Sequence, residues 1–347
     1  MNISMDLSKL PYEAKVALAK DEQTSPELLA AFANDGSEEI RLMVAWNENT
    51  PAEALAELAS NEEECVRVAV ATNKNTFAKT LANLANDISE EVRIAVAENV
   101  NTPSHILTLL AEDENALVRQ SVASNPNTLP ETLESLAEDT MPFVREAVVQ
   151  NGNAPEKVFL KLAKDEYSIN RHYVASNPNV PAEILAFLTK DDEWRVRYAV
   201  ARNENTPKEA LTVLAKDIDW RVRKAVASNK NAPEEVLSNL AKDDDTSVRE
   251  SVVHNQNISS HTLAILSNDK NANIRYNVAS HQKTSLETLA KLALDSNYSV
   301  RYAVARNKNT PFETLTALTQ DECPYVREAA TQALSERKVK NKCDMVK

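Results

Sequence analysis

An arginine recurs every 26 residues along this chain, and no insertion or deletion interrupts the series. Five copies stand in a Val-Arg-x-Ala-Val-Ala context, as at Val92 to Ala97, and the others depart from it at one or two positions; Lys15 holds the same position one period before the first arginine. A fixed period of this length is the signature of a solenoid, in which stacked units share one continuous core. The arginines are Arg41, Arg67, Arg93, Arg119, Arg145, Arg171, Arg197, Arg223, Arg249, Arg275, Arg301 and Arg327.

The composition predicts that the repeated units are helical. Only two glycines, Gly36 and Gly152, occur in 347 residues, and aromatic residues make up 5% of the chain. Sheets rely on glycine-containing turns and on aromatic or β-branched strands. Alanine and leucine, which dominate the repeat, are good helix formers. We therefore predict an all-α solenoid of about twelve layers, each built from two short helices.

The start of each unit predicts how its first helix begins. In Thr50-Pro51-Ala52-Glu53 we expect the threonine to cap, the proline to take the first helical position and the glutamate to complete a capping box. Leucines three residues apart, such as Leu55 and Leu58, predict one buried stripe on a helix of about nine to eleven residues. The second helix holds the Val-Arg segment and is expected to run for about two to three turns.

Two polar positions also recur with the period. An aspartate precedes the arginine by six residues, and only Asn61 breaks this row. Because the Asp and Arg recur together in nearly every layer, we interpret them as structural, a charge pair that fixes register. Most units close with Asn-x-Asn, as at Asn99 and Asn101. Asparagine tolerates left-handed backbone and bonds to its own main chain, so we expect it to replace glycine here, and stacked copies can form a ladder.

The ends of the chain are expected to differ from the interior. Residues 1–14 are predicted to cap the first layer, and a single solenoid is predicted over 15–334. Ala333 stands where an asparagine closes the other units, so the array is expected to end there. Residues 335–347 are basic and polar, and we predict a disordered tail.

The pattern of Val-Arg, alanine, asparagine, Thr-Pro, a leucine pair and Ala-x-Asp resembles the leucine-rich repeat variant family over residues 15–334. The resemblance implies an α-helix and a short, 3₁₀-like helix stacked into a right-handed superhelix. The spacing from the aspartate to Val-Arg also resembles HEAT repeats, where this pair forms a ladder between layers. One family member carries an iron–sulfur cluster on clustered cysteines, but Cys65, Cys323 and Cys343 are far apart in sequence. The resemblance therefore implies neither a cofactor nor a catalytic role here.

The sequence shows no pattern typical of a catalytic or metal-binding site. Its five histidines make no His-x₃-His pair, and its cysteines make no Cys-x₂-Cys pair. Two glycines cannot build a phosphate-binding loop. There is no apolar run of about 20 residues, and the start of the chain lacks a signal-like apolar region. We therefore expect a cytoplasmic protein that is not an enzyme, spans no membrane and binds no metal or cofactor.

Candidate functional residues lie where the layers differ from one another. On the second helix of a unit, the position after the arginine and the position four residues later share one side. Tryptophan, tyrosine and arginine are enriched at interface hot spots, and they gather on or beside this side in the C-terminal half of the chain. The candidate partner-binding residues are Trp194, Arg195, Tyr198, Arg202, Trp220, Arg221, Lys224, Tyr276, Tyr302 and Arg306.

This side is interpreted as a surface that binds a protein or an extended peptide. One alternative is that the amphipathic rings merely cover the groove between helices. Another is nucleic-acid binding by the stripe of Arg195, Arg202, Arg221 and Lys224, although a net charge of −13 disfavours contact with phosphate backbones. A third is a purely structural repeat protein in which the variation has no function.

Overall fold

The structure, a computed structural model, describes residues 10–344 and side chains as far as Arg337. The described part contains 25 α-helices and no strand, which confirms the all-α class. The chain divides into two compact units, Met1–Val174 and Ala175–Lys347, and each is described by itself. The predicted boundaries at residues 14 and 334 stay predictions, as does the handedness of the superhelix, and residues 1–9 lie outside the described part.

Each layer pairs a short even-numbered helix with a longer odd-numbered one, and α1 (Tyr12–Lys20) precedes the first pair. The even-numbered helices have seven residues each: α2 (Pro26–Phe32), α4 (Ala52–Leu58), α6 (Ala78–Leu84), α8 (Ser104–Leu110), α10 (Pro130–Leu136), α12 (Glu156–Leu162), α14 (Ala182–Leu188), α16 (Lys208–Leu214), α18 (Glu234–Leu240), α20 (Ser260–Leu266), α22 (Leu286–Leu292) and α24 (Phe312–Leu318). Most odd-numbered helices have nine residues: α3 (Glu38–Trp46), α5 (Glu64–Thr72), α7 (Glu90–Glu98), α9 (Ala116–Ser124), α11 (Pro142–Gln150), α13 (Ser168–Ser176), α15 (Trp194–Arg202), α17 (Trp220–Ser228), α19 (Thr246–Val253, eight residues), α21 (Ala272–Ser280), α23 (Tyr298–Arg306) and α25 (Pro324–Asp344, 21 residues).

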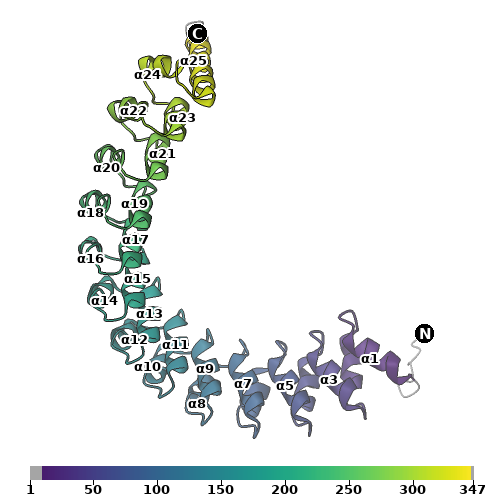
Figure 1. The fold of residues 1–347 in the computed structure, drawn as a ribbon. Helices are drawn as coiled ribbons and strands as arrows, with labels where there is room; N and C mark the ends of the chain where they lie inside the picture. The colour runs from purple at the N-terminus through teal and green to yellow at the C-terminus, as the bar shows by residue number, and fades with distance from the viewer. Residues whose placement is uncertain (1–9, 345–347) are drawn as a thin grey trace. The chain divides into compact units, whose positions relative to one another are not determined.

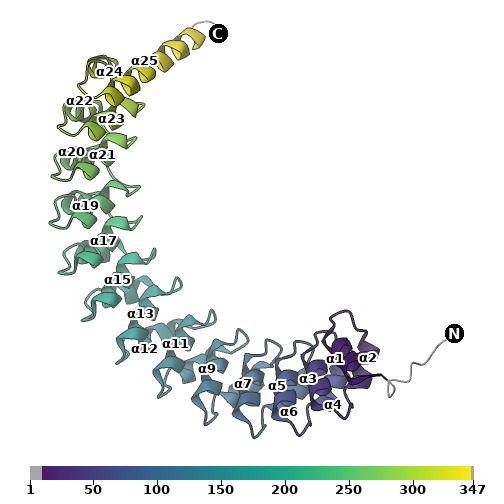
Figure 2. The same cartoon turned by 45° about the vertical axis from the view of Figure 1, so that its right-hand side comes forward.

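Within each unit the two kinds of helix form two rows (Figures 1 and 2). Successive odd-numbered helices pack closely against one another, whereas successive even-numbered helices touch much less. The predicted stripes meet between the rows: Leu55 of α4 is fully buried, and so are Val92, Val96 and Ala97 of α7. Small alanines on the odd-numbered helices allow this close packing. The two-helix layer is confirmed, although both helices are α-helices and neither is 3₁₀.

Each layer is tied to the layer before it by the first asparagine of Asn-x-Asn. Asn99 donates from Nδ2 to the carbonyl oxygens of Ala71 (2.7 Å) and Asn73 (3.1 Å), and its Oδ1 accepts the N–H of Asn101 (2.9 Å). The expected ladder is therefore present. The same two Nδ2 bonds recur at Asn47, Asn73, Asn125, Asn151, Asn203, Asn229, Asn255 and Asn307.

The predicted left-handed backbone at these asparagines is wrong. Asn99 has φ −68° and ψ 124°, which is extended backbone, and no described residue has a positive φ. The asparagine is needed for its amide instead. Its amide supplies a donor to the carbonyl oxygen of Ala71, near the end of the preceding layer's odd-numbered helix, and a second donor to the carbonyl oxygen of Asn73, which also accepts the N–H of Thr76. The chain manages with two glycines because its turns require no left-handed residue.

A second ladder joins each arginine to the aspartate of the next layer. Arg93 contacts the Asp113 carboxylate through Nε (2.6 Å) and Nη2 (3.0 Å), and its Nη1 donates to the carbonyl oxygen of Asp87, six residues earlier (2.9 Å). This confirms the expected ladder between layers. The equivalent pairs are Arg67–Asp87, Arg119–Asp139, Arg145–Asp165, Arg197–Asp217, Arg223–Asp243, Arg249–Asp269, Arg275–Asp295 and Arg301–Asp321.

The layer that lacks the aspartate shows what the aspartate contributes. Because Asn61 stands in its place, Arg41 pairs with Glu63 instead, at 3.0 Å. The Nε atom of Arg41 is buried and has no hydrogen-bond partner among the described residues. At the start of the array Lys15 takes the arginine's role and contacts Asp35 at 2.7 Å. The bidentate geometry therefore needs both arginine and aspartate.

The predicted capping role of the repeated threonine is also wrong. Thr50 donates its hydroxyl back to the carbonyl oxygen of Val44 at 2.6 Å, so it satisfies the end of the preceding helix. The N-cap of α4 is Pro51, which makes no side-chain cap bond, and the helix is shorter than the nine to eleven residues expected. The same backward bond is made by Thr24, Thr76, Thr102, Thr128, Thr206, Thr284 and Thr310.

The C-terminal segment differs from the predicted disordered tail. Helix α25 runs without a break from Pro324 to Asp344. Arg337 helps to hold it, because its two terminal nitrogens donate to the carbonyl oxygens of Thr310 (2.6 Å) and Lys308 (2.7 Å). A guanidinium thus closes the last layer, where most other layers use an asparagine amide.

His281 occupies a first-asparagine position in the ladder. Its Nδ1 accepts the N–H of Lys283 at 3.0 Å, as the asparagine oxygen does elsewhere, and this requires a neutral imidazole. The Lys283 ammonium donates to the carbonyl oxygens of Gln256 (2.7 Å) and Ile258 (3.2 Å). Burial, reinforced by the charges of Lys283 and His254, lowers the pKa of His281 below its ordinary 6.5.

We expect His281→Asn to stabilise the second unit by about 1 kcal/mol near pH 7, because asparagine restores the repeated ladder bonds. Since the folded pKa of His281 lies below the unfolded one, its neutral form supports folding above about pH 6.5, and this support is lost as the pH falls through the folded pKa. The advantage of the variant should therefore grow with acidification. Urea unfolding at several pH values measures it, with His105→Asn, an exposed histidine on α8, as control. An advantage that does not change with pH contradicts the assignment.

Candidate functional site

All ten candidate partner-binding residues lie in the second unit, on odd-numbered helices. They form two groups with one residue between them. Six line a groove between α15 and α17, and two line a groove between α23 and α25. Tyr276, on α21, is 39% exposed and lines neither groove. Arg195 lies beside the first groove, with its guanidinium over the ring of Trp194 at 4.8 Å.

The groove between α15 and α17, called the α15–α17 groove, has a volume of about 520 Å³. Six of its eight lining residues belong to the set predicted from the sequence. It opens on the side of the odd-numbered helices because the residue after the ladder arginine and the residue four later face outward together. The lining residues are Trp194, Tyr198, Arg202, Trp220, Arg221, Lys224, Ala225 and Ser228.

One arginine of this groove is held firmly by its neighbours. The guanidinium of Arg221 stacks over the ring of Trp194, 3.7 Å from the ring centroid. Its Nε and Nη2 also donate to the Asp219 carboxylate, at 2.9 and 2.7 Å. The hydrogen bond to Arg221 holds the pKa of Asp219 below its ordinary value, and the same bond raises the pKa of Arg221. The charge of Arg221 is thus neutralised and its position fixed.

The other two cations of the groove have no ion-pair partner among the described residues. Arg202 lies over the ring of Tyr198, 5.8 Å from the centroid, and Lys224 is exposed. Tyr198 in turn meets Trp194 edge to face, with the ring centroids 6.2 Å apart. Cation–π contact orients a guanidinium without cancelling its charge. The groove therefore combines aromatic walls with two uncompensated positive charges.

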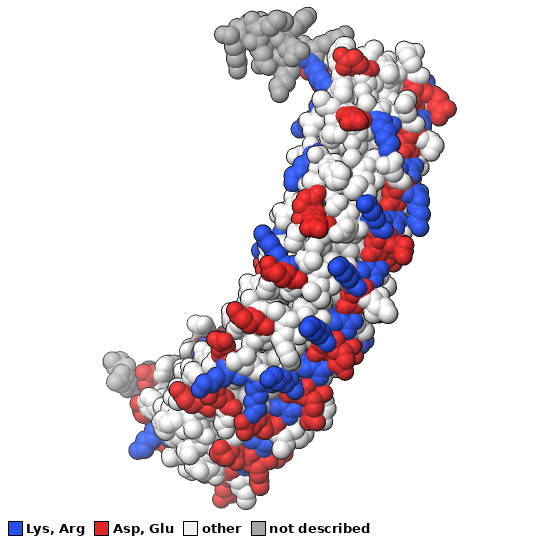
Figure 3. All heavy atoms as spheres, turned by 90° about the vertical axis from the view of Figure 1, so that its left-hand side faces the viewer, with Lys and Arg blue, Asp and Glu red and all other residues white. Residues whose placement is uncertain are grey.

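The predicted basic stripe is weaker than its sequence suggests. Of its four cations, Arg221 is paired with Asp219, and Arg195 approaches Glu193 at 3.3 Å. The stripe lies on the odd-numbered helices. Figure 3 shows the other side of the second unit, that of the even-numbered helices, where acidic and basic side chains lie interspersed along one edge. Only Arg202 and Lys224 of the stripe remain without a carboxylate partner within the described chain.

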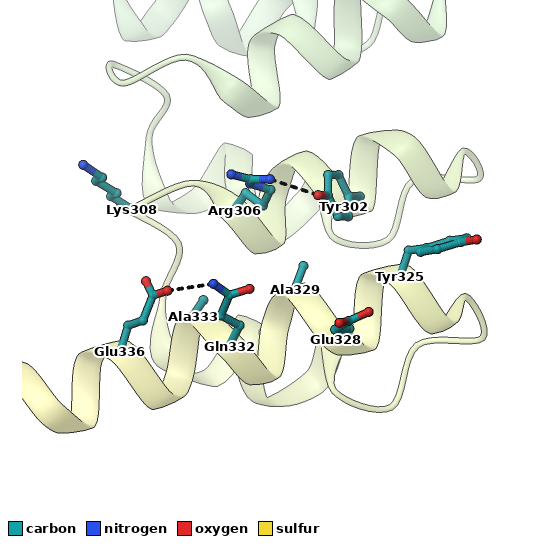
Figure 4. A pocket seen from close by; sticks show the side chains of 9 residues that line it. All are labelled: Tyr302, Arg306, Lys308, Tyr325, Glu328, Ala329, Gln332, Ala333 and Glu336. Atoms are coloured by element: carbon teal, nitrogen blue, oxygen red, sulfur yellow. Dashed lines mark hydrogen bonds between the residues drawn. The ribbon is translucent and has the colours of Figure 1, made fainter.

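The second group lines the α23–α25 groove, of about 410 Å³, at the last layer (Figure 4). Arg306 donates from Nη1 to the hydroxyl oxygen of Tyr302 at 3.0 Å, and this bond raises the pKa of Arg306. The guanidinium also lies over the tyrosine ring at 5.8 Å, the same distance as in the Tyr198–Arg202 pair. The lining residues are Tyr302, Arg306, Lys308, Tyr325, Glu328, Ala329, Gln332, Ala333 and Glu336.

Sequence reasoning does not find the α25 side of this groove. Figure 4 shows that Glu328, Gln332 and Glu336 lie along α25 opposite Tyr302 and Arg306, with Gln332 bonded to Glu336 at 2.9 Å. They are missed because the candidates are selected among tryptophan, tyrosine, arginine and lysine residues, and these three are acidic or amide side chains. Glu328 does occupy the position after the ladder arginine, a signal that applies to this layer as well.

Neither groove contains a recognisable catalytic arrangement. Among the side chains that the structure describes, no group of three or more histidines, cysteines, aspartates or glutamates is placed to share a metal ion. None of the described helices is both long and apolar enough to cross a membrane. The chemistry that the grooves do offer is aromatic stacking, cation–π contact and charge-assisted hydrogen bonding.

Comparisons with known proteins address the repeat itself. The family model described as "Leucine rich repeat variant" matches residues 90–115 and 220–245, one segment in each unit. A solved structure described as "a leucine-rich repeat variant with a novel repetitive protein structural motif" matches with a TM-score of 0.51 and 28% identity, over 63% of this chain and 87% of that one. The resemblance to the leucine-rich repeat variant is confirmed.

Other comparisons add little to the leucine-rich repeat variant assignment. The crystal structure of an engineered protein covers 94% of both chains, but its TM-score of 0.30 and 20% identity are too low to support an argument. The comparison with curated protein sequences found no match. The chain is thus an all-α repeat protein that is similar to the leucine-rich repeat variant, and the grooves described above distinguish its layers from one another.

Proposed function

We propose that this protein is a non-enzymatic scaffold that binds a protein or an extended peptide on the odd-numbered helices of its second unit. The observation that carries the proposal is the α15–α17 groove, where Trp194, Tyr198 and Trp220 stand together with Arg202 and Lys224. Tryptophan, tyrosine and arginine are the residue types that dominate interface energetics. Trp220 keeps 40% of its surface exposed, although a buried position would stabilise so large a ring.

The fold supports this proposal because the ladders leave the groove side chains free. The bonds between layers are made by the repeated arginine, aspartate and asparagine, so the variable positions are not needed for stacking. A rigid array that presents its variable residues on one row is the arrangement by which solenoids bind extended partners. The alternative is that the aromatic rings merely cover the groove between helices. This explains Trp194, whose ring is stacked by Arg221, better than it explains Trp220.

The test begins with selection of binders to the full chain from a display library of random peptides of about 16 residues. Tyr198→Ala combined with Trp220→Ala is expected to weaken binding of the selected peptides by about 30-fold or more, the effect of losing a hot spot. Phe312→Ala on α24 removes an exposed aromatic ring from the row of even-numbered helices and serves as the matched control. Calorimetry measures each affinity, and thermal melting checks that each variant folds.

Two results contradict the proposed function. One is failure to select any saturable binder. The other is undiminished binding after the double substitution. Equal losses in the Phe312→Ala control show that the effect is unspecific, which also counts against the groove.

A further inference from the structure

We infer that the α15–α17 groove selects acidic residues, so that the partner of this scaffold is an extended acidic peptide that also carries an aromatic or aliphatic side chain. The inference rests on the proposed function and names the chemistry of the partner. It follows from the way charge is distributed between two grooves that are otherwise alike.

The two grooves share their first wall. Helices α15 and α23 end in the same sequence, Tyr-Ala-Val-Ala-Arg, and each places its arginine 5.8 Å from its tyrosine ring. The pairs Tyr198–Arg202 and Tyr302–Arg306 are therefore one structural device used twice in the second unit. Differences in what the grooves bind must come from the helix that forms the opposite wall.

The opposite walls differ in charge. In the α15–α17 groove the wall from α17 supplies Arg221 and Lys224 and no carboxylate, and only Arg221 has an acidic neighbour, Asp219. In the α23–α25 groove the wall from α25 supplies the carboxylates of Glu328 and Glu336. The two basic residues of this groove, Arg306 and Lys308, are thus matched in number by its two acidic residues. With Asp219 counted beside Arg221, the first groove carries a net charge of +2, whereas the lining of the second, in which no ion pair among the described residues joins Arg306 or Lys308 to a glutamate, is neutral.

Arg202 and Lys224 stand together at one groove of a chain whose net charge is −13. Some exposed lysines pair with a carboxylate of the neighbouring layer, as Lys74 does with Glu48 and Lys230 with Glu204, whereas Lys208, Lys216 and Lys242 do not within the described chain. What distinguishes Arg202 and Lys224 is that both line an aromatic groove whose lining residues include no carboxylate. Complementary potential steers partners and suppresses wrong ones. An acidic side chain between Arg202 and Lys224 completes the groove.

The aromatic walls specify the rest of the partner. Trp194 is stacked by Arg221 and lies under Arg195, so its ring faces are occupied by the protein's own cations. The ring of Trp220 is stacked by no described cation and is exposed. An apolar or aromatic side chain next to the acidic one fits this wall. A bare polyanion satisfies the cations but leaves the tryptophan exposed, which favours a peptide over a nucleic acid.

The test uses fluorescently labelled twelve-residue peptides that carry leucine and phenylalanine at fixed positions and glutamate, glutamine or lysine at the remaining ones. The glutamate peptide is expected to bind the full chain most tightly. Arg202→Gln with Lys224→Gln should weaken its binding by about 3- to 10-fold and abolish the preference for glutamate over glutamine, the effect of losing two partly exposed charge pairs. Arg306→Gln is the matched control, because it alters the same Tyr–Arg device in the neutral groove.

A charge reversal sharpens the result. Arg202→Glu with Lys224→Glu should make the lysine peptide the tightest binder, whereas Arg306→Glu should leave the order unchanged. Because all three positions are exposed, these variants are expected to fold, and thermal melting verifies it. A labelled single-stranded oligonucleotide of thymidines is tested at low and high salt in parallel.

The outcomes separate the two proposals. If peptides bind in the groove but the glutamine or lysine peptide binds best, the acidic preference is overturned and the proposed function stands. If no peptide binding depends on groove residues, both fail. Saturable oligonucleotide binding that requires Arg202 and Lys224 and weakens steeply with salt overturns the peptide in favour of a nucleic acid.

Discussion

Replacing Arg249 with methionine is expected to destabilise the second unit by about 3 to 5 kcal/mol, because the Asp269 carboxylate is then buried without its partner. The two side chains are 6% and 3% exposed, and they are joined through Nε at 2.6 Å and Nη2 at 3.1 Å. The variant also leaves the carbonyl oxygen of Asp243 without the Nη1 bond of 2.8 Å. Urea unfolding followed by the fluorescence of Trp194 and Trp220 measures the loss.

The dependence of this loss on pH follows from the carboxyl group. Burial alone would raise the pKa of Asp269, but the bonds from Arg249 and from the N–H of Asn271 hold it below its ordinary value of 3.8. The pair therefore stabilises the fold above about pH 4, and this contribution is lost as the pH falls through the folded pKa. The difference between wild type and variant should shrink in acid.

Two further variants isolate the cause of the expected loss. Adding Asp269→Asn to Arg249→Met should recover part of the stability, because the uncompensated charge is removed. Lys74→Met breaks an ion pair whose side chains are 58% and 68% exposed, and is expected to cost less than about 1 kcal/mol. A loss below 1 kcal/mol for Arg249→Met would show that the ladder is incidental to stability.

Replacing Asn229 with alanine is expected to destabilise the second unit by about 3 kcal/mol, because two buried carbonyl groups lose their only described side-chain donor. Asn229 donates to the carbonyl oxygens of Ala201 (2.8 Å) and Asn203 (3.0 Å), and it accepts the N–H of Asn231 at 2.8 Å. Asn229→Asp should lose even more at neutral pH, since a carboxylate would then face two carbonyl oxygens.

Amide hydrogen exchange locates this effect, because the N–H of Asn231 bonds directly to the substituted side chain. Its exchange should accelerate in both variants. Asn231→Ala is the control, since Asn231 is half-buried and bonds through its side chain to the carbonyl oxygen of Glu204. A loss for Asn229→Ala no greater than for Asn231→Ala would refute the assigned importance of the buried amide.

The periodic part of the fold follows from the sequence because it is encoded in every layer. The 26-residue spacing predicts the two-helix unit, and the leucine and valine stripes predict its core. The local details were less accessible. Thr50 and Asn99 have well-known roles at helix ends and turns, yet each contacts a backbone carbonyl of another helix. Propensity rules for a single helix do not include such acceptors.

The candidate site was predicted in composition but not in geometry. The sequence places Trp194, Tyr198 and Arg202 on one side of a helix, and the structure brings them into one groove. It does not say that Asp219 neutralises Arg221, which depends on a side-chain conformation within one turn. It also does not reveal the α25 wall of the α23–α25 groove, because the acidic and amide side chains of that wall are not of the residue types by which candidates are selected.

The bonds between layers have a consequence for how such a chain can change its length. They join residues 20, 26, 27 or 28 positions apart, and the same separations recur in successive layers. Duplication or excision of one whole period restores every one of these separations at the new junction. Loss of a single residue shifts all of them at once and leaves a guanidinium, an amide and two carbonyl groups without partners. The chain is therefore free to grow or shrink by recombination between its own copies, in steps of one period and in no smaller step.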